Sequence, residues 1–321
     1  MRVVFMGTPD FAVPSLQALQ ESKHEIVGVV TQPDRPRGRG RKLAAQPVKE
    51  LALKYKLPVI QPEKVGSEET IETLKQWNPQ LIVVVAFGQI LPLKVLQLPP
   101  AGCINVHASL LPKYRGAAPI HRAIINGEKE TGITTMFMDE GLDTGDIILQ
   151  EAIPIPAQAT AGEIHDRLAT LGAEVLLRSI TLIEEGRAPR IPQDESQATY
   201  APPLTRRDEL IDWHRRAEEI VNQVRGMNPW PGAYTTFRDN EILKIWRAEV
   251  IERPSGRRKV IPGQLIGIEE RGFIVATGHD GSVMVTEVQR RGKKKMPAAD
   301  FLRGCRMEPG MILGQTRTVE A

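Results

Sequence analysis

The sequence predicts an α/β protein of two domains: an N-terminal Rossmann-like domain with a doubly wound parallel sheet, and a small C-terminal β-barrel of the OB type. Three observations support this prediction. Short β-branched runs alternate with helix-compatible stretches in the first half of the 321-residue chain, a proline-rich stretch follows, and closely spaced short strand patterns come last. Alternation is typical of a parallel sheet covered on both faces, and short strands at this spacing are typical of small barrels.

The first half of the chain supplies the elements of the N-terminal domain. The predicted strands are Arg2–Met6, Glu25–Val30, Leu81–Phe87, Cys103–Val106, Gly132–Met138 and Ile147–Ile153. The predicted helices are Phe11–Gln20, Pro47–Tyr55, Glu68–Trp77 and a long helix from about Gly162 to Glu184. Single helices between apolar strands indicate crossover connections, so we expect neighbouring strands to run parallel.

A change of texture then divides the chain. The stretch from Gly186 to Arg207 contains four prolines and few apolar residues, which predicts an extended linker. After a short helix near Ala217–Val224, the predicted strands are Leu243–Ala248, Gly263–Ile268, Gly272–Thr277 and Val283–Val288. We therefore expect an N-terminal domain over residues 1–188, a linker over residues 189–207 and the β-barrel over residues 208–321.

The composition is that of an ordinary globular protein. A hydrophobic content of 41% with 25% charged residues argues against wholesale disorder. The longest apolar run, Leu81–Phe87, is far shorter than the roughly 20 residues that a bilayer requires. The first residues, MRVVFMGTPDF, resemble neither a signal peptide nor a transit peptide. We expect a cytoplasmic monomer whose two cysteines, Cys103 and Cys305, form no disulfide.

The net charge of +3 is unevenly distributed. From Arg206 onward there are 21 basic and 16 acidic residues, a surplus of five positive charges, whereas the preceding residues carry a surplus of two negative charges. A basic C-terminal third favours a polyanionic partner without indicating a fold.

Three polar side chains are candidates for a reactive centre. The segment Gly102–Arg115 reads GCINVHASLLPKYR, and alternate residues of a strand share one face, so Asn105 and His107 project together, roughly 6–7 Å apart. They end a predicted parallel strand, where α/β sheets place ligands. Asp143 lies in the loop GLDTGD between two predicted strands, and this loop can bring a carboxylate back over the sheet edge.

These residue types suit acyl transfer to an amine. An Asn amide can donate to the oxyanion that forms. A His can exchange protons near neutral pH, and a carboxylate beside it fixes the ring orientation. Spacing alone leaves ordinary alternatives open, because Asn105 and His107 can also be a polar pair on a strand, and Asp143 a turn residue.

Longer motifs narrow these alternatives. The chain contains NVHASLLPKYRG (Asn105–Gly116), GLDTGD (Gly141–Asp146), GTPDFA (Gly7–Ala12), TQPDRPRGRGRKL (Thr31–Leu43), VVVAFGQILP (Val83–Pro92), RGAAPIHRAI (Arg115–Ile124) and NPWPGAY (Asn228–Tyr234). With these motifs, which extend across both domains, the sequence resembles the folate-dependent formyltransferases. The resemblance implies that Asn105, His107 and Asp143 are the catalytic set. It also implies transfer of the formyl group of 10-formyltetrahydrofolate to the α-amine of methionyl initiator tRNA, for translation initiation, by direct amine attack through a tetrahedral intermediate.

The resemblance also implies a folate cleft beside the catalytic strand. Two segments match its walls: SLLP, which comprises Ser109, Leu110, Leu111 and Pro112, and the loop of Phe87, Gly88, Gln89, Ile90 and Leu91. An apolar slot with a few backbone donors and acceptors suits a flat heterocycle. A buried turn remains the alternative for SLLP. The motif GTPDFA contains only Gly7 where a dinucleotide-binding protein has Gly-x-Gly-x-x-Gly, so we expect no NAD.

Two basic clusters are candidates for contact with the tRNA. The first, in the loop Pro33–Leu43, comprises Arg35, Arg37, Arg39, Arg41 and Lys42, and the resemblance assigns this loop to the tRNA acceptor end. The second, on a predicted hairpin, comprises Arg290, Arg291, Lys293, Lys294 and Lys295. Such cations would contact phosphates without reading sequence, and a solvated loop is the alternative in each case.

No metal site is expected, because the histidines show no ligand spacing with one another or with the cysteines. Two rival functions are weighed. A formyltransferase for a purine-pathway amine or an amino sugar would share the three polar residues but would not need both basic clusters. A non-catalytic RNA-binding module would explain the clusters but not the catalytic set.

Overall fold

The computed structural model describes residues 1–37, 42–238, 240–252 and 260–314, and the chain divides into two compact units. The N-terminal unit comprises Met1–Pro119, Glu130–Pro154 and His165–Ala201. The C-terminal unit comprises Ile120–Lys129, Ile155–Ile164 and the chain from Pro202 onward. Two short segments of the first half therefore pack with the second half of the chain.

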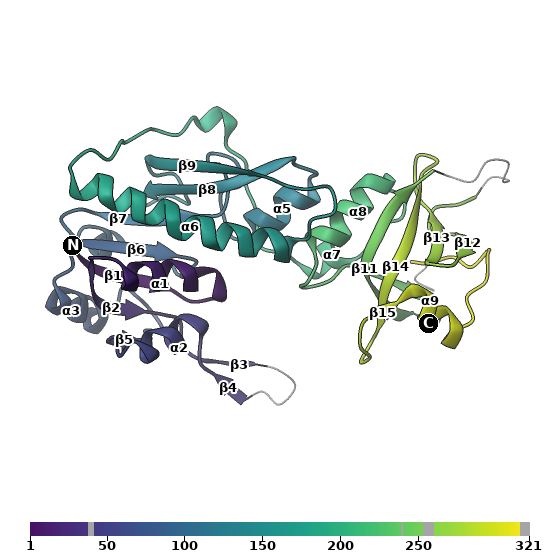
Figure 1. Cartoon of the computed structure of the whole chain (residues 1–321), viewed down its shortest axis with the longest axis horizontal. Helices are drawn as coiled ribbons and strands as arrows, with labels where there is room; N and C mark the ends of the chain where they lie inside the picture. The colour runs from purple at the N-terminus through teal and green to yellow at the C-terminus, as the bar shows by residue number, and fades with distance from the viewer. Residues whose placement is uncertain (38–41, 239, 253–259, 315–321) are drawn as a thin grey trace, which may run out of the picture. The chain divides into compact units, whose positions relative to one another are not determined.

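A seven-stranded sheet forms the centre of the N-terminal unit, in the order β5-β2-β1-β6-β7-β8-β9 (Figure 1). The strands are β1 (Arg2–Gly7), β2 (Glu25–Val30), β5 (Val59–Ile60), β6 (Leu81–Val85), β7 (Cys103–His107), β8 (Glu130–Phe137) and β9 (Ile147–Pro154). The strands from β5 to β7 are parallel, as predicted. The sheet is mixed rather than wholly parallel, because β8 runs antiparallel to both β7 and β9.

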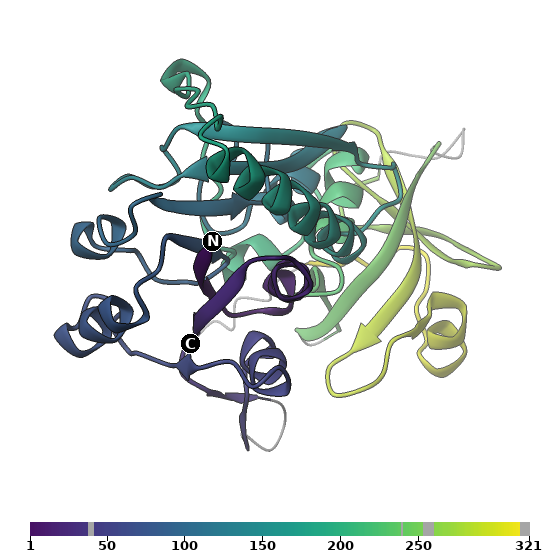
Figure 2. The ribbon, with the colours of Figure 1, turned by 60° about the vertical axis from the view of Figure 1, so that its left-hand side comes forward.

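Helices cover this sheet, and their ends follow local sequence signals. They are α1 (Val13–Glu21), α2 (Pro47–Lys54), α3 (Glu68–Trp77), α4 (Leu93–Leu96) and the long α6 (Ala161–Glu184). Ser67 caps α3 by accepting a hydrogen bond from the Thr70 backbone, and Asn78 ends it in the left-handed conformation. In Figures 1 and 2, α6 lies along β7 and β8. Gly172 permits this approach, because a Cβ there would lie 3.1 Å from Val106 on β7.

The first basic loop begins and ends as a short hairpin. Its strands are β3 (Arg35–Arg37) and β4 (Lys42–Ala44), and Arg37 pairs with Lys42 in the antiparallel register. The sequence predicted only that this loop is not helical. Arg39 and Arg41 lie outside the described residues.

The C-terminal unit contains an antiparallel sheet, as predicted, in the order β10-β11-β14-β13-β12, with β15 paired to β14. Its strands are β10 (Tyr234–Phe237), β11 (Glu241–Ile251), β12 (Leu265–Glu269), β13 (Gly272–Ala276), β14 (Ser282–Arg290) and β15 (Met296–Pro297). The helices are α5 (Pro119–Ile125), α7 (Arg206–Glu209), α8 (Ala217–Gly226) and α9 (Ala298–Gly304). The long strands β11 and β14 lie side by side (Figure 2).

Candidate active site

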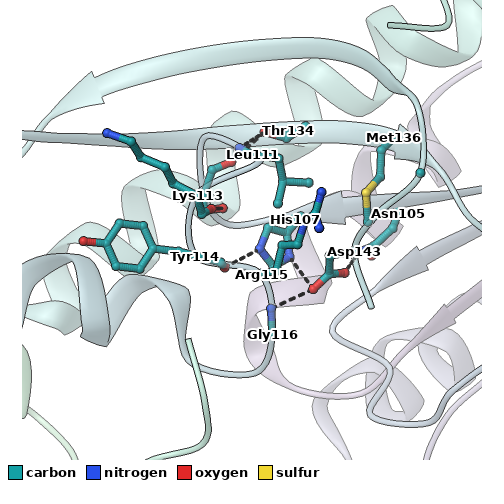
Figure 3. A network of polar contacts seen from close by, with 12 residues as sticks. Asn105, His107, Leu111, Lys113, Tyr114, Arg115, Gly116, Thr134, Met136 and Asp143 are labelled. Atoms are coloured by element: carbon teal, nitrogen blue, oxygen red, sulfur yellow. Dashed lines mark hydrogen bonds and ion pairs between the residues drawn. The ribbon is translucent and has the colours of Figure 1, made fainter. Parts of the chain in front are cut away.

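Asn105, His107 and Asp143 meet at the carboxyl end of β7 (Figure 3). Asn105 and His107 alternate on this strand and are only 9% and 6% exposed. Asp143 comes from the loop between β8 and β9, 38 residues after Asn105. The Asn105 Nδ2 atom donates to Asp143 Oδ1 over 3.4 Å, and His107 Nδ1 lies 3.7 Å from Asp143 Oδ2. The structure thus brings together the three residues that the sequence singled out.

The Asp143 loop is held by several contacts. Asp143 has a φ of 54°, a left-handed conformation that a non-glycine residue adopts only when its surroundings enforce it. The backbone of Gly116 donates to Asp143 Oδ2 over 2.8 Å. The Gln193 amide donates to the carbonyls of Asp143 and Gly145, over 2.8 and 2.9 Å. Gly145 is required there, because a Cβ would lie 1.7 Å from the Phe137 carbonyl oxygen.

The second ring nitrogen of His107 determines which proton the first can carry. His107 Nε2 lies 3.0 Å from the Tyr114 carbonyl oxygen, which can only accept. The Nε2 atom therefore carries the hydrogen in the neutral ring, and Nδ1 is left as the basic nitrogen that faces Asp143. Tyr114 is itself held in the left-handed region, with a φ of 62° and its backbone nitrogen donating to Thr199 Oγ1.

Arg115 supports the same loops from below. Its side chain is fully buried, and it donates to both carboxylate oxygens of Glu195 over 2.7 and 2.9 Å. It also donates to Gln193 Oε1, the other end of the amide that holds the Asp143 loop. The hydrogen bonds from Arg115 lower the pKa of the Glu195 carboxyl, so the pair is ionised in neutral solution.

The SLLP segment is fixed by hydrogen bonds from β8 and β9. Thr134 Oγ1 donates to the Ser109 carbonyl over 2.6 Å and accepts from the Leu111 backbone over 3.1 Å. Gln150 donates to the Leu111 carbonyl over 2.7 Å. Leu111 is buried and Leu110 and Pro112 are partly exposed, so the segment is a braced turn at the site.

The loop from Phe87 to Leu91 leaves the sheet at the same edge, because β6 and β7 are parallel neighbours with Val84 opposite Asn105. Phe87 and Leu91 are buried, Gly88 has a φ of 84°, and Ile90 is 84% exposed. The Gln89 amide accepts from the Val65 backbone and donates to the Pro62 carbonyl. Gln89 therefore braces the loop through its side chain.

The predicted basic residues differ in their surroundings. Arg35 is exposed on β3, and the backbones of Arg37 and Lys42 belong to the hairpin. In the second cluster, Arg290 donates to Glu241 on β11 over 2.7 and 3.0 Å. The Lys295 ammonium lies 4.2 Å from the ring centre of Trp246. The other three residues of this cluster, Arg291, Lys293 and Lys294, are exposed.

Within the described ranges, no group of three or more His, Cys, Asp and Glu side chains is arranged to hold a metal ion. The same ranges contain no helix that is long and apolar enough to cross a bilayer. Cys103 is a free, buried thiol, and its burial raises its pKa to about 12.

Sequence reasoning missed several residues that build this site. Arg115 lies in a quoted motif but received no role, and Thr134 and Gln150 gave no signal in a strand pattern. Gln193 lies in the predicted linker, which was expected only to be extended. Its contacts reach back 50 residues to Asp143, and no local pattern encodes such a distance.

Comparisons with known proteins support the resemblance. Residues 1–180 match a family model described as formyl transferase, and residues 203–306 match the formyl transferase C-terminal domain. A methionyl-tRNA formyltransferase of Pelotomaculum thermopropionicum is 57% identical over 315 residues, which cover 98% of this chain and 99% of that protein. A methionyl-tRNA formyltransferase of Moorella thermoacetica is 57% identical over 314 residues, with the same coverage.

Solved structures share the fold at lower identity. An N-formyltransferase from Helicobacter canadensis, in complex with folinic acid and dTDP-3-aminofucose, has a TM-score of 0.64 at 19% identity, over 90% of this chain and 99% of that one. A methionyl-tRNA formyltransferase from Clostridium thermocellum has a TM-score of 0.53 at 18% identity, over 78% of this chain and 93% of that one.

Proposed function

Since the chain belongs to the formyl transferase family, we propose that it transfers the formyl group of 10-formyltetrahydrofolate to the α-amine of methionyl initiator tRNA, for translation initiation. The family uses folate-derived formyl donors. The observation that carries the chemistry is the junction of Asn105, His107 and Asp143 at one sheet edge. Relatives named for this activity match nearly the whole chain, which supports the choice of acceptor.

The amide of Asn105 is suited to stabilise the oxyanion. An Asn side chain has two N–H donors, and one of them is engaged by Asp143 Oδ1. The second N–H remains for the oxygen that becomes negative when the amine attacks the formyl carbon. Because Asn105 is 9% exposed, this donor acts where water is largely excluded, so it is worth more than a donor in solution.

His107 is suited to move the protons. The attacking nitrogen must lose a proton and the departing folate nitrogen must gain one, and the Nδ1 atom of His107 is the free basic site. Asp143 stabilises the imidazolium that forms and holds the ring orientation. Such general acid–base assistance contributes about 10²- to 10⁴-fold in rate. Asp143 acts through His107 and Asn105 and is a positioning residue in this mechanism.

The residues beside this junction fit a folate donor. The apolar side chain of Ile90 stands in solvent above the buried Phe87 and Leu91, as expected for one wall of a slot that is complete only with a ligand. The SLLP segment offers a second, braced wall across β6 and β7. We assign Ser109–Pro112 and Phe87–Leu91 to this slot.

The basic residues are assigned to the tRNA backbone. They are the hairpin residues Arg35, Arg37, Arg39, Arg41 and Lys42 and the cluster Arg290, Arg291, Lys293, Lys294 and Lys295. Cations on exposed loops bind phosphates with strong salt dependence and little sequence discrimination. The corresponding division of labour is a catalytic domain over residues 1–188, a linker over residues 189–207 and a tRNA-binding domain over residues 208–321. The enzyme acts as a monomer in the cytoplasm.

One assay tests this function. The protein is incubated with 10-formyltetrahydrofolate and charged initiator tRNA, and the aminoacyl ester is hydrolysed and analysed for formylmethionine. We expect formylmethionine at a rate that saturates in both substrates. A folded protein that formylates an amino-sugar nucleotide but gives no formylmethionine would contradict the assignment of the acceptor.

A further inference from the structure

A cavity of about 370 Å³ lies within the C-terminal unit, and none of the motifs singled out above explains it. Its lining comes from three segments of this unit: the turn before α6, the helix α8 and the strand β11. The lining residues are Gln158, Thr160, Val221, Val224, Arg225, Trp246, Arg247, Ala248 and Glu249.

Irregularity in β11 builds one wall of the cavity. Trp246, Arg247, Ala248 and Glu249 are consecutive, yet all four line it, although successive residues of a regular strand point to opposite faces. The pairing of β11 with β14 shifts register between Ile245 and Arg247, and again between Arg247 and Ala248. Bulges of this kind re-aim side chains and are frequent at functional sites.

Arg225 is the unusual residue of this cavity. It is 7% exposed, and its hydrogen-bond acceptors are two neutral oxygens, Asn222 Oδ1 at 2.9 Å and the Ala159 carbonyl at 3.2 Å. Over the described part of the chain, no carboxylate lies within 4.0 Å of its guanidinium. Burial without a countercharge lowers the pKa of Arg225, although a guanidinium stays charged at neutral pH.

A helix C-terminus favours a cation, and Arg225 lies in the last turn of α8. That interaction, about 0.3–1 kcal/mol, needs no burial and does not offset the several kcal/mol that desolvating a charge costs. A buried, unpaired charge is tolerated when a ligand supplies the countercharge. The position of Arg225 at the cavity wall therefore indicates an anionic ligand.

The other charges of the cavity support the same sign. Arg247 is exposed at the wall and forms no ion pair with any described residue. Glu249, the one acid of the lining, is already paired with Arg271 over 2.9 Å. Two guanidinium groups are thus left without a countercharge around one cavity.

Trp246 connects this cavity to the second basic cluster. Its ring lines the cavity while Lys295 lies over it at 4.2 Å and Lys244 at 5.5 Å from the ring centre. The cations of Arg225, Arg247, Lys244 and Lys295 therefore follow one path across the unit. Because lysines lie over the indole, the path suits a charged backbone better than a stacked base.

We propose that the cavity between α8 and β11 receives a backbone phosphate of the tRNA substrate, held by the forked donors of Arg225 and Arg247. The proposal rests on the proposed function for the identity of the polyanion. A guanidinium suits phosphate because its parallel N–H groups match two phosphate oxygens. A phosphate buried beside Arg225 fixes the position of the tRNA on the unit, whereas the exposed lysines contribute attraction without a fixed geometry.

Salt-dependent binding of methionyl-tRNA tests the proposal, with the full-length variants Arg225→Gln and Arg247→Gln. We expect each to weaken tRNA binding about 3- to 10-fold and to reduce the slope of log K against log salt by about 0.7–0.9, the value for one lost phosphate contact. The turnover number at saturating tRNA and the KM for the folate donor should not change. Arg225→Lys, which keeps the charge, should restore the slope but only part of the affinity.

Arg306→Gln is the matched control, because Arg306 is exposed in the same unit and forms no ion pair with the described residues. It should leave affinity and slope unchanged. The proposal is overturned if Arg247→Gln, folded and active, binds tRNA with the wild-type slope. It is also overturned if inorganic phosphate binds the cavity by calorimetry while neither variant alters the tRNA slope, because the site would then serve a free anion. A wild-type protein that forms no formylmethionine would instead contradict the proposed function.

Discussion

The two units each bury an arginine, and the two residues differ in what surrounds their charge. Arg115 in the N-terminal unit is fully buried and ion-paired with Glu195, whose hydrogen bonds raise the pKa of the guanidinium. Arg225 in the C-terminal unit is 7% exposed and meets only neutral oxygens, and burial lowers its pKa. A buried charge with its partner in the chain braces structure, whereas a buried charge without a partner is available to a ligand.

The same contrast extends to the polar groups around each arginine. In the N-terminal unit, Arg115, Gln193 and Asp143 form a continuous chain of hydrogen bonds that ends at His107. This arrangement is pre-organised for chemistry before any substrate arrives. The cavity of the C-terminal unit lacks such closure, so we expect substitutions there to change tRNA affinity and substitutions in the N-terminal unit to change turnover.

The largest effect is expected at His107. The substitution His107→Asn keeps a polar side chain of similar size but removes the group that exchanges protons. Turnover at saturating substrates should fall about 10²- to 10⁴-fold, while the Kd for methionyl-tRNA stays within about twofold of wild type. Rapid-quench assays and a separate binding titration measure the two quantities.

His279→Asn is the control for this change, because His279 is exposed in the C-terminal unit and adopts a left-handed φ of 54° that Asn tolerates. It should keep full turnover. Near wild-type turnover in His107→Asn would remove His107 from the mechanism and break the contrast between the units.

The two buried arginines can be compared directly by the same replacement. Arg115→Met removes four hydrogen bonds to Glu195 and Gln193 and should lower the free energy of unfolding by about 2–4 kcal/mol. Arg225→Met removes an unpaired buried charge, so it should change the free energy by less than about 1 kcal/mol in either direction. Urea denaturation of both variants measures the difference. Equal losses of stability would mean that Arg225 is also a structural residue.

A third arginine predicts a smaller, pH-dependent effect. Arg122 donates to both carboxylate oxygens of Asp208 over 2.6 and 3.1 Å, and this pairing lowers the pKa of Asp208 to about 2. Because the folded-state pKa is depressed, the stabilisation is present above the unfolded pKa of about 4 and is lost as the pH falls from about 4 to 2. We expect a contribution of about 1–2 kcal/mol, since the pair is mostly buried.

Urea denaturation of wild type and Arg122→Gln at pH 5 and pH 2.5 measures this contribution. The variant should lose stability at pH 5 and should differ little from wild type at pH 2.5. A constant difference between the two proteins over this range would assign the stabilisation to the backbone acceptors of Arg122, the carbonyls of Pro202 and Pro203, rather than to Asp208.

Much of this structure could be predicted from local patterns. The β-branched runs ending at Val30, Val85 and His107 became buried parallel strands because a sheet covered on both faces needs continuous apolar sequence. The alternation of Asn105 and His107 placed both side chains on one face, as a strand requires. The antiparallel direction of β8 could not be predicted, because the runs before and after the turn at Gly127 carry no signal of direction.

The sequence by itself determined the residue types of the reactive centre, the periodicity that formed the strands and the excess of cations in the last third. Only the tertiary structure decided that Gln193 of the predicted linker holds the Asp143 loop, that Glu195 neutralises Arg115, and that no acid does so for Arg225. The physical reason is range. Periodicity and caps act over a few residues, whereas burial and ion pairing depend on whichever distant segments the fold brings against a side chain.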